Sequence, residues 1–245
     1  MKRLKLLLSN DDGINGEGLK ALAYKLCEKH DVTVVAPVLN MTASSHAITI
    51  GKEITIKKVE FGKGIKAYAV AGTPADCVKF ALAYLELDVD LVLSGINKGH
   101  NIGTDLLYSG TVSAALEGVF MGKPAIAFSA ESEENNNFPL CASYVPMLIE
   151  KLYPTLKKGE AYNVNIPDNR EIIGVKTTKI GSHRYDEKYT SSKEDIFVLS
   201  GDPIEGQEND IDCDVELIKK GYITVTPIKY DFTDYEKLEN IKELF

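Results

Sequence analysis

The chain has 245 residues, of which 44% are hydrophobic and 26% are charged, and its formal net charge is −8 at pH 7. This composition is typical of a globular protein, so disordered, collagen-like and coiled-coil structures are disfavoured. The acidic balance argues against binding to nucleic-acid polymers, which draws on clustered Lys and Arg. An anionic small molecule can still bind where a metal ion or backbone amides supply positive potential.

Four scattered cysteines, none of them in a C-x-x-C pair, stand at Cys27, Cys77, Cys141 and Cys213. This spacing predicts neither a zinc ribbon nor a thioredoxin-type site and favours reduced core residues. The apolar run 4–8 is too short for a signal-peptide core, and no stretch approaches the roughly 18 apolar residues of a membrane span. We therefore expect a soluble, cytoplasmic protein without a membrane partner.

Short apolar runs alternate with helical patterns through the first half of the chain. Predicted strands cover residues 4–8, 32–36, 66–71, 89–93 and 125–129, and predicted helices cover 17–29, 74–87, 111–121 and 140–153. A hairpin-like excursion is expected over 52–66. Because strands that alternate with helices are typical of βαβ units, we predict an α/β fold, a Rossmann-like three-layer αβα arrangement with a mostly parallel sheet.

The pattern changes after about residue 154. Further strands are predicted over 162–166, 172–180, 196–199 and 222–227, followed by a tail helix over 235–245. The stretch 182–214 is polar, and long loops of this kind are usually functional, mobile or exchanged with a partner subunit. We interpret residues 1–245 as a single domain, with an α/β core of about 1–153 and a strand- and loop-rich part of about 154–245.

Ligands of open α/β sheets bind at the carboxyl ends of the strands, and polar clusters follow the predicted strands there. The first cluster is Ser9-Asn10-Asp11-Asp12-Gly13. Its adjacent carboxylates repel each other, and a hard divalent cation would offset that repulsion. The alternative is a solvated Asp-Asp-Gly turn. The second cluster follows Ala36-Pro37 and, taken alone, is an ordinary polar loop with Asn40, Thr42, Ser44, Ser45 and His46.

Two further clusters are rich in Gly, Asn and hydroxyl groups. The stretch 94–103 contains Asn97 and Asn101, each able to offer an amide oxygen to a metal ion or an amide NH₂ to a phosphate. It matches neither the P-loop nor the dinucleotide fingerprint. Ser109-Gly110-Thr111 opens a predicted helix, whose free N–H groups can bind a phosphate. The alternative for Ser109-Gly110-Thr111 is an ordinary helix cap. For residues 72–76, which show the same ambiguity, we prefer the helix cap.

These clusters, in this order and spacing, resemble the SurE (survival protein E) family over about residues 4–230. The resemblance rests on Asn10-Asp11-Asp12-Gly13, Ala36-Pro37, Gly72-Thr73-Pro74-Ala75-Asp76-Cys77, Ser94-Gly95-Ile96-Asn97-Lys98-Gly99, Ser109-Gly110-Thr111-Val112-Ser113-Ala114-Ala115 and Gly221-Tyr222-Ile223-Thr224-Val225-Thr226-Pro227. It implies a metal-dependent phosphatase that acts on nucleoside monophosphates as a 5′-nucleotidase. Activity on 3′-nucleotides and on polyphosphate are further options within the family.

The resemblance also implies roles for individual residues. Asp11, Asp12 and Asn97 match the metal ligands for one divalent cation per subunit, Mg²⁺ or Mn²⁺, and Thr42 stands where the family usually has a ligating serine. Asn101 and the stretch Ser109, Gly110 and Thr111 match phosphate-binding positions, with Asp11, Asp12 and Asn101 as the catalytic group. Ala43 replaces a frequent Gly and His100 a frequent Pro. Family members form dimers or tetramers through C-terminal segments, so we expect a homodimer or homotetramer involving about 182–245.

The expected reaction is attack on the phosphoryl group by a water that the cation activates, with Asp11 or Asp12 as proton acceptor. An aspartyl-phosphate route is disfavoured, because haloacid-dehalogenase phosphatases use Asp-x-Asp rather than adjacent carboxylates. A non-catalytic nucleotide- or phosphate-binding regulator and a structural assembly protein are the alternatives. Paired carboxylates beside a phosphate favour the enzyme, since without a metal they would repel the ligand. Arg184 and Tyr185 are further candidates for base or phosphate contact.

Overall fold

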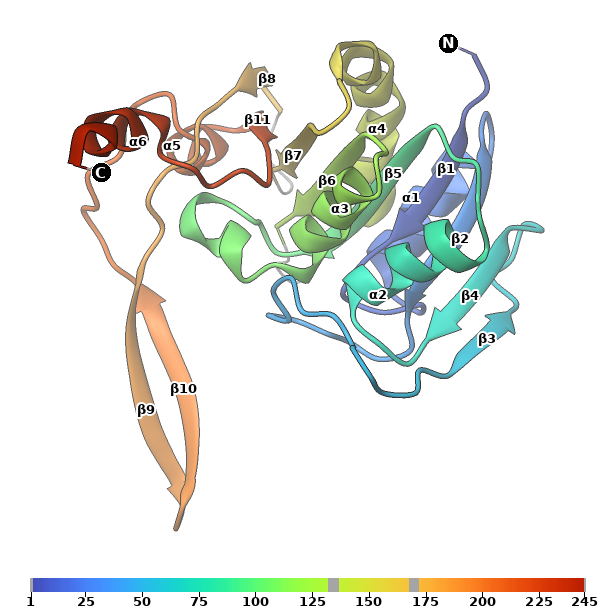
Figure 1. Ribbon diagram of the computed structural model, residues 1–245, viewed down its shortest axis with the longest axis horizontal. Coiled ribbons are helices and arrows are strands. Elements are labelled where there is room, and N and C mark those ends of the chain that lie inside the picture. Colours follow the sequence, from blue (N-terminus) through green and yellow to red (C-terminus); the bar gives the residue numbers. More distant parts are fainter. Residues whose placement is uncertain (1, 132–136, 168–171, 245) are drawn as a thin grey trace.

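The computed structural model describes residues 2–131, 137–167 and 172–244, and within them a nine-stranded sheet has the order β3-β4-β2-β1-β5-β6-β7-β11-β8 (Figure 1). Pairing is parallel from β4 through β7, whereas β3 and β11 run antiparallel to β4 and β7. The strands are β1 (Lys5–Ser9), β2 (Asp31–Pro37), β3 (Ile56–Val59), β4 (Lys66–Val70), β5 (Leu91–Lys98), β6 (Ala125–Ala130), β7 (Ala161–Ile166), β8 (Gly174–Thr177) and β11 (Tyr222–Ile228).

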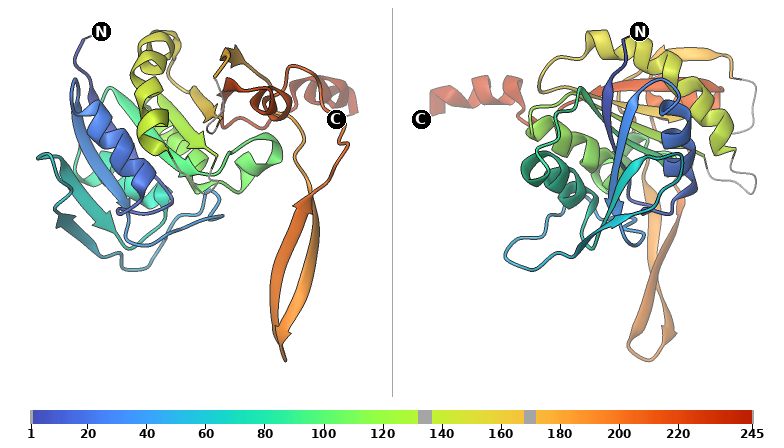
Figure 2. Two further views of the ribbon diagram at one scale, coloured as in Figure 1. Left: turned by 180° about the vertical axis from the view of Figure 1, so that it is seen from behind. Right: turned by 90° about the vertical axis from the view of Figure 1, so that its right-hand side faces the viewer.

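Helices pack on both faces of this sheet, which confirms the three-layer αβα prediction (Figure 2). One apolar core lies between the sheet and α1 and α4, and a second lies between the sheet and α2 and α3. The helices are α1 (Glu17–Leu26), α2 (Pro74–Lys79), α3 (Gly110–Phe120), α4 (Phe138–Leu152), α5 (Asp214–Lys219) and α6 (Tyr235–Ile241).

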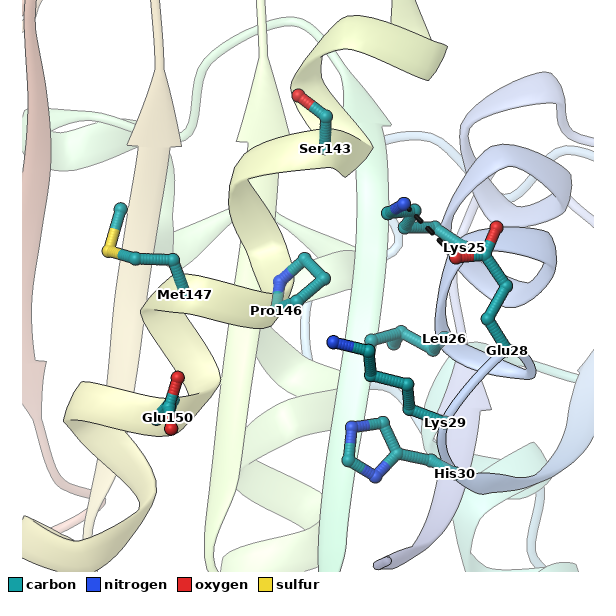
Figure 3. A pocket seen from close by; sticks show the side chains of 9 residues that line it. All are labelled: Lys25, Leu26, Glu28, Lys29, His30, Ser143, Pro146, Met147 and Glu150. Atoms are coloured by element: carbon teal, nitrogen blue, oxygen red, sulfur yellow. Dashed lines mark hydrogen bonds and ion pairs between the residues drawn. The ribbon is translucent and has the colours of Figure 1, made fainter. Parts of the chain in front are cut away.

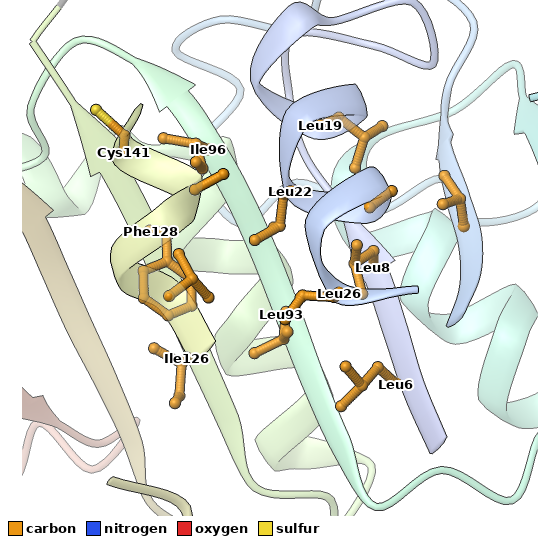
Figure 4. Packing of buried hydrophobic residues seen from close by; sticks show 14 of the residues in the cluster. Leu6, Leu8, Leu19, Leu22, Leu26, Leu93, Ile96, Ile126, Phe128 and Cys141 are labelled. Carbon is orange, nitrogen blue, oxygen red and sulfur yellow. The ribbon is translucent and has the colours of Figure 1, made fainter. Parts of the chain in front are cut away.

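Strand β1 shows why its sequence reads as a continuous apolar run. Leu6 and Leu8 point into the core under α1 and α4, and Leu7 points into the core on the other face. A strand covered by helices on both sides loses the usual apolar–polar alternation, because both of its faces are buried. Figure 4 shows Leu6 and Leu8 beside the leucines of α1 and Leu93 of β5.

Several predicted elements end earlier than the apolar pattern suggested. The predicted helix 17–29 ends at Leu26, and the predicted helix 74–87 begins as expected on a capping box of Thr73 and Asp76. This second helix changes after Lys79 into a π-helical turn, Phe80–Tyr84, in which the Leu85 N–H bonds to the Phe80 carbonyl. Apolar spacing alone does not distinguish these two helix types over one turn.

The second half of the chain contains two elements that the sequence reading missed. Strand β9 (Tyr185–Lys193) pairs with β10 (Ile196–Pro203) in a two-stranded hairpin that extends away from the sheet in every view (Figures 1 and 2). Only residues 196–199 of this hairpin were predicted as strand, because β9 is polar throughout. The short helix α5 was also missed, the predicted strand 172–180 shortens to β8, and the excursion 52–66 supplies β3.

The tail helix is confirmed as α6 followed by a 3₁₀ turn over Lys242–Leu244, and Phe245 lies outside the described residues. All four cysteines are free, three of them buried and Cys27 half-buried, in agreement with the expected reduced core residues. In the described ranges, no helix is long and apolar enough to cross a membrane.

Candidate active site

The carboxylate pair lies where β1 ends and meets the start of α3. Asp11 is 4% exposed, and its Oδ1 accepts a hydrogen bond of 2.5 Å from the Thr111 hydroxyl. Asp12 is half-buried, and its Oδ2 accepts a bond of 3.2 Å from the backbone N–H of Lys98 at the end of β5. The fold therefore brings together three of the predicted clusters, those at residues 9–13, 94–103 and 109–111.

Both carboxyl groups hold their protons more tightly than usual. Burial raises the pKa of Asp11, opposed by the Thr111 hydroxyl and by the backbone amides of Gly110 and Thr111. Burial also raises the pKa of Asp12, to about 6, and the charge of Asp11 adds to that shift. The nearby Lys98 opposes it through its backbone N–H and then through its charge. Two adjacent carboxylates with raised pKa values form a site that positive charge would stabilise.

The N-terminus of α3 is packed closely against Asp11. Ser109 caps the helix, since its Oγ accepts a 3.1 Å bond from the Val112 N–H. A β-carbon on Gly110 would lie 2.7 Å from the Asp11 β-carbon and 2.7 Å from the Ser44 hydroxyl oxygen. Only glycine fits there, and the close approach puts the first amides of α3 beside the carboxylate.

The same contact shows a hydroxyl whose role the sequence reading did not assign. Ser44 Oγ is buried against Gly110, and it has no hydrogen-bond partner within the described part of the chain. The predicted ligand Thr42 is exposed, and its hydroxyl donates to Asn40. Between them, Ala43 has a φ of +56°, in the left-handed region, which turns the chain sharply. Motif alignment alone cannot reveal which hydroxyl such a turn directs inward.

Contacts with three other elements hold the loop of Thr42 and Ser44 in place. The Met41 N–H bonds to the Asp11 carbonyl at 2.7 Å, and the Ser45 hydroxyl donates to the Leu107 carbonyl at 2.7 Å. His46 Nε2 lies 2.9 Å from the buried Glu117 carboxylate of α3, which also pairs with Lys79 at 2.7 Å. The loop is therefore fixed on both sides of its hydroxyl groups.

The position of Asn97 is fixed by an irregularity at the end of β5. Gly95 has a φ of +126°, and a β-carbon there would lie 2.2 Å from the Phe128 carbonyl oxygen, so the position requires glycine. The pairing register of β5 with β6 shifts between Ser94 and Asn97. The Asn97 amide nitrogen donates a 2.8 Å hydrogen bond to the Gly99 carbonyl, which leaves the amide oxygen as the group that can bind a ligand.

Asn101 is buried and held from three directions. Its amide nitrogen donates to Ser129 Oγ at 2.8 Å, and its backbone N–H bonds to Asn165 Oδ1 at 2.8 Å. Its carbonyl accepts from the amides of Asn163 and Asn165. These bonds fix the loop after β5, and the predicted phosphate contact of Asn101 stays a prediction.

The donor set fits a hard divalent cation. Across residues 2–131, 137–167 and 172–244, no three His, Cys, Asp or Glu side chains gather into a group that could hold a metal ion. An ion at Asp11 and Asp12 would therefore need neutral oxygens as well, and the amide oxygen of Asn97 and the unpartnered hydroxyl of Ser44 are of that type. Carboxylate, amide and hydroxyl oxygens are the ligands preferred by Mg²⁺ and Mn²⁺.

Cavities lie at both ends of the strands of the sheet. One of about 620 Å³ lies between the end of α1 and α4, near the start of β2, and none of the predicted site residues lines it. Figure 3 shows the side chains that line this cavity. Another, of about 440 Å³, lies beside the loop after β5 and is lined by Tyr185 together with His100 and His183. Arg184 is exposed and is not among its lining residues. Sequence reasoning had not singled out His183.

Comparison with known proteins identifies the family to which the chain belongs. The family model described as survival protein SurE matches residues 6–187. The chain belongs to the SurE family. A SurE relative from Clostridium botulinum (strain Alaska E43 / Type E3), named 5′-nucleotidase SurE, is 41% identical, and the match covers 99% of this chain and 100% of the relative. The 5′-nucleotidase SurE of Pelotomaculum thermopropionicum is 39% identical over 98% of this chain and 95% of its own.

The SurE fold is also shared with a solved structure. The crystal structure of the SurE protein from Aquifex aeolicus has a TM-score of 0.85 and 35% sequence identity to this chain. The match covers 98% of this chain and 99% of that one. The similarity therefore extends through the C-terminal part and is not confined to the α/β core.

Proposed function

We propose that this protein hydrolyses nucleoside 5′-monophosphates to a nucleoside and inorganic phosphate, with one divalent cation per subunit. The observation that carries the proposal is the pair of adjacent aspartates at the end of β1, of which Asp11 is buried against the N-terminus of α3. A phosphate at that helix terminus would stand beside the Asp11 carboxylate, and a cation held by the aspartates would offset the repulsion. Relatives that match almost the whole chain carry the name 5′-nucleotidase.

Asp11, Asp12 and the Asn97 amide oxygen would hold the cation, Mg²⁺ or Mn²⁺, and a hydroxyl from Thr42 or Ser44 would complete the protein ligands. When bound, the ion supplies Lewis-acid polarisation of the phosphoryl group and lowers the pKa of water. Ser44 is as suitable a ligand as Thr42, because its hydroxyl is buried near Asp11 and has no hydrogen-bond partner among the described residues.

The chain's own groups bind the phosphate and move the proton. The first amides of α3, with Ser109, Gly110, Thr111 and Asn101, would stabilise the charge that develops on the phosphoryl oxygens. Asp12 is the better proton acceptor of the two aspartates, since it is more exposed than Asp11, whose carboxylate already accepts the Thr111 hydroxyl. Asp11 is held by Thr111 and serves as a fixed anion.

Direct attack by water is favoured over an aspartyl-phosphate, because both carboxylates are needed as oxygen donors. The bond from the water oxygen to phosphorus forms as the ester P–O bond breaks, and the nucleoside leaves with a proton from solvent. The same phosphate-binding groups admit 3′-nucleotides and short polyphosphate, which we include as further substrates of the proposed enzyme.

We also propose that the protein assembles as a homodimer or homotetramer through its C-terminal part. Every residue of β10 is exposed, including Phe197 and Leu199. Helix α6 has no buried residue. Apolar groups on a two-stranded hairpin are typical of a surface that another molecule covers, since an isolated hairpin is only marginally stable in water.

The deciding experiment measures phosphate release from AMP by the wild-type protein, after EDTA and after Mg²⁺ or Mn²⁺ is restored, beside Asp11→Asn. We expect the activity to require the cation and to fall by about a hundredfold or more in the variant. Asp88→Asn is the matched control, because that side chain is 83% exposed and pairs with Lys5 at the opposite edge of the sheet. A folded wild-type protein that releases no phosphate with any cation would support the nucleotide-binding regulator instead.

A further inference from the structure

The cavity of about 620 Å³ between α1 and α4 lies at the end of the sheet opposite the candidate active site. The turn after α1 forms one wall with Lys29 and His30, and α4 forms the other (Figure 3). His30 directly precedes β2, whereas the carboxylate pair Asp11 and Asp12 follows β1. Because β1 and β2 run parallel, a ligand in this cavity would not meet that carboxylate pair.

His30 brings an unpaired hydrogen-bond donor to this cavity. The residue is 4% exposed, and its Nδ1 accepts the backbone N–H of Leu4 at 3.2 Å. The neutral ring therefore carries its proton on Nε2, and Figure 3 shows the second ring nitrogen on the side that faces α4. Within the described part of the chain, no group accepts a hydrogen bond from Nε2. A buried donor without an acceptor is costly, so this N–H indicates a position for a ligand.

Positive charge surrounds this imidazole ring. Burial lowers the pKa of His30, and the charges of Arg3 and Lys29 lower it further, so the ring stays a neutral donor near neutral pH. A smaller cavity of about 340 Å³ also has His30 in its lining, together with Lys63 and Lys66. The two linings hold five Lys and Arg side chains against three Asp and Glu side chains, although the whole chain has a net charge of −8. This end of the sheet would therefore attract an anion.

The three carboxylates of the linings are placed where they do not oppose an anion at His30. Glu28 is paired with Lys25 at 3.1 Å, and Asp31 is paired with Arg3 at 2.7 Å. The third carboxylate, Glu150, stands on α4, across the cavity from the turn after α1 (Figure 3). An anion beside the turn would therefore meet donors and cations first.

Lys29 is the cation best placed to share a ligand with His30. Its ammonium group forms no ion pair with a carboxylate of the described residues, and Figure 3 shows the side chain extended toward Pro146. Leu26, Pro146 and Met147 add apolar surface to the lining. Small-molecule sites combine apolar walls with a few polar groups in this way, and the volume falls within their usual range of about 300–1,000 Å³.

We propose that the cavity between α1 and α4 binds a small organic anion, whose carboxylate or phosphate group is held by the Lys29 ammonium and the His30 Nε2–H. The apolar body of the ligand would lie against Leu26 and Pro146. This site is separate from the proposed nucleotidase site, since none of the groups proposed to bind the cation or the substrate phosphate lines the cavity. Its test is therefore independent of nucleotidase activity.

The test titrates the full-length protein, in EDTA, with benzoate and with phenylphosphonate, which carry the two kinds of charged group on the same ring. Amide NMR signals locate the probe, because the Leu4 N–H bonds directly to His30. We expect the signals of Leu4 and Lys29 to shift and that of Gly110, at the N-terminus of α3, to stay. The probe with the higher affinity identifies the preferred charged group, and binding of either one here supports the proposal. If neither probe shifts the Leu4 signal, the proposal is overturned.

Two variants then assign the contacts. Lys29→Met keeps the aliphatic stem and removes the charge, so the Kd of the bound probe should rise by about tenfold, as loss of a charged hydrogen bond predicts. His30→Phe keeps the ring size and should have a similar effect, but it also removes the acceptor of the Leu4 N–H. Lys20→Met is the matched control, because Lys20 lies on the same helix outside the cavity lining, and its Kd should stay within about twofold of wild type. An unchanged Kd in Lys29→Met contradicts the proposal, whether or not His30→Phe folds.

Discussion

The sheet core and the β9–β10 hairpin use apolar side chains in opposite ways. In the core, Leu93 of β5 and Phe128 of β6 are completely buried between helices and strands. In the hairpin, Phe197 is 60% exposed and Leu199 is 48% exposed. The core therefore stabilises itself, whereas the hairpin has apolar surface that only another molecule can cover. Four experiments sharpen this contrast or break it, and they are ordered by expected effect on folding.

The largest effect is expected for Leu93→Ala. Removing a fully buried leucine side chain leaves a cavity between the sheet and α1, so the free energy of unfolding should fall by about 3 kcal/mol. Urea denaturation measures it. Leu140→Ala is the control, since Leu140 is 44% exposed on α4, and its change should stay within about 0.5 kcal/mol. Equal effects in the two variants would contradict the description of the core.

Asp214→Asn tests the junction between the two regions. The Asn side chain would turn an NH₂ group toward the N–H of Gly103 or of Gly181, so one buried backbone donor would lose its acceptor. We expect a loss of about 2 kcal/mol and faster amide exchange at the glycine whose N–H loses its acceptor. Asp212→Asn, with its side chain 66% exposed, should show neither effect. Unchanged exchange would mean that Asp214 does not fasten the two regions.

Asp12→Asn should stabilise the protein when no divalent cation is present. Because the folded pKa of Asp12 is raised to about 6 from 3.8, the folded state holds this proton more tightly than the unfolded state. Stability therefore falls as pH rises from about 4 to about 6, and the cost stays above that range. After allowance for solvent screening at this half-buried group, the variant should gain about 1–2 kcal/mol at pH 7.

Thermal unfolding with EDTA and with Mg²⁺ measures this prediction. Added cation should stabilise the wild type and have little effect on the variant, so the order of the two proteins reverses. If the variant were less stable than wild type in EDTA, the buried charge of Asp12 beside Asp11 would not destabilise the folded protein.

The smallest effect on protomer folding is expected for the double variant Phe197→Ser and Leu199→Ser. Both side chains are exposed in the protomer, so its unfolding should change by less than about 0.5 kcal/mol. The molar mass by light scattering should fall from that of a dimer or tetramer to the 26.9 kDa of one chain. Tyr84→Ser is the control outside the hairpin. A wild type that is already monomeric would contradict the proposed assembly.

The α/β core could be predicted because its sequence pattern follows from burial. Strands covered on both faces are short apolar runs, and caps such as Thr73 with Asp76 mark where a helix begins. Strand β9 could not be predicted, since all of its side chains after the half-buried Tyr185 are exposed and it therefore carries no apolar alternation. Its pairing depends on backbone bonds to β10, which leave no residue pattern in β9.

The candidate site divides in the same way. Asp11, Asp12, Asn97 and the 109–111 stretch were found from the sequence, because strand ends and a helix start place such residues at one edge of a parallel sheet. The sequence alone also determined the fold class and the oxygen-rich chemistry of the candidate site. Tertiary structure decided that the Ser44 hydroxyl packs against Gly110 and that His183 lines a pocket with Tyr185. The Ser44–Gly110 and Asp105–His183 contacts join residues that are 66 and 78 positions apart. No local sequence pattern records such a long-range contact.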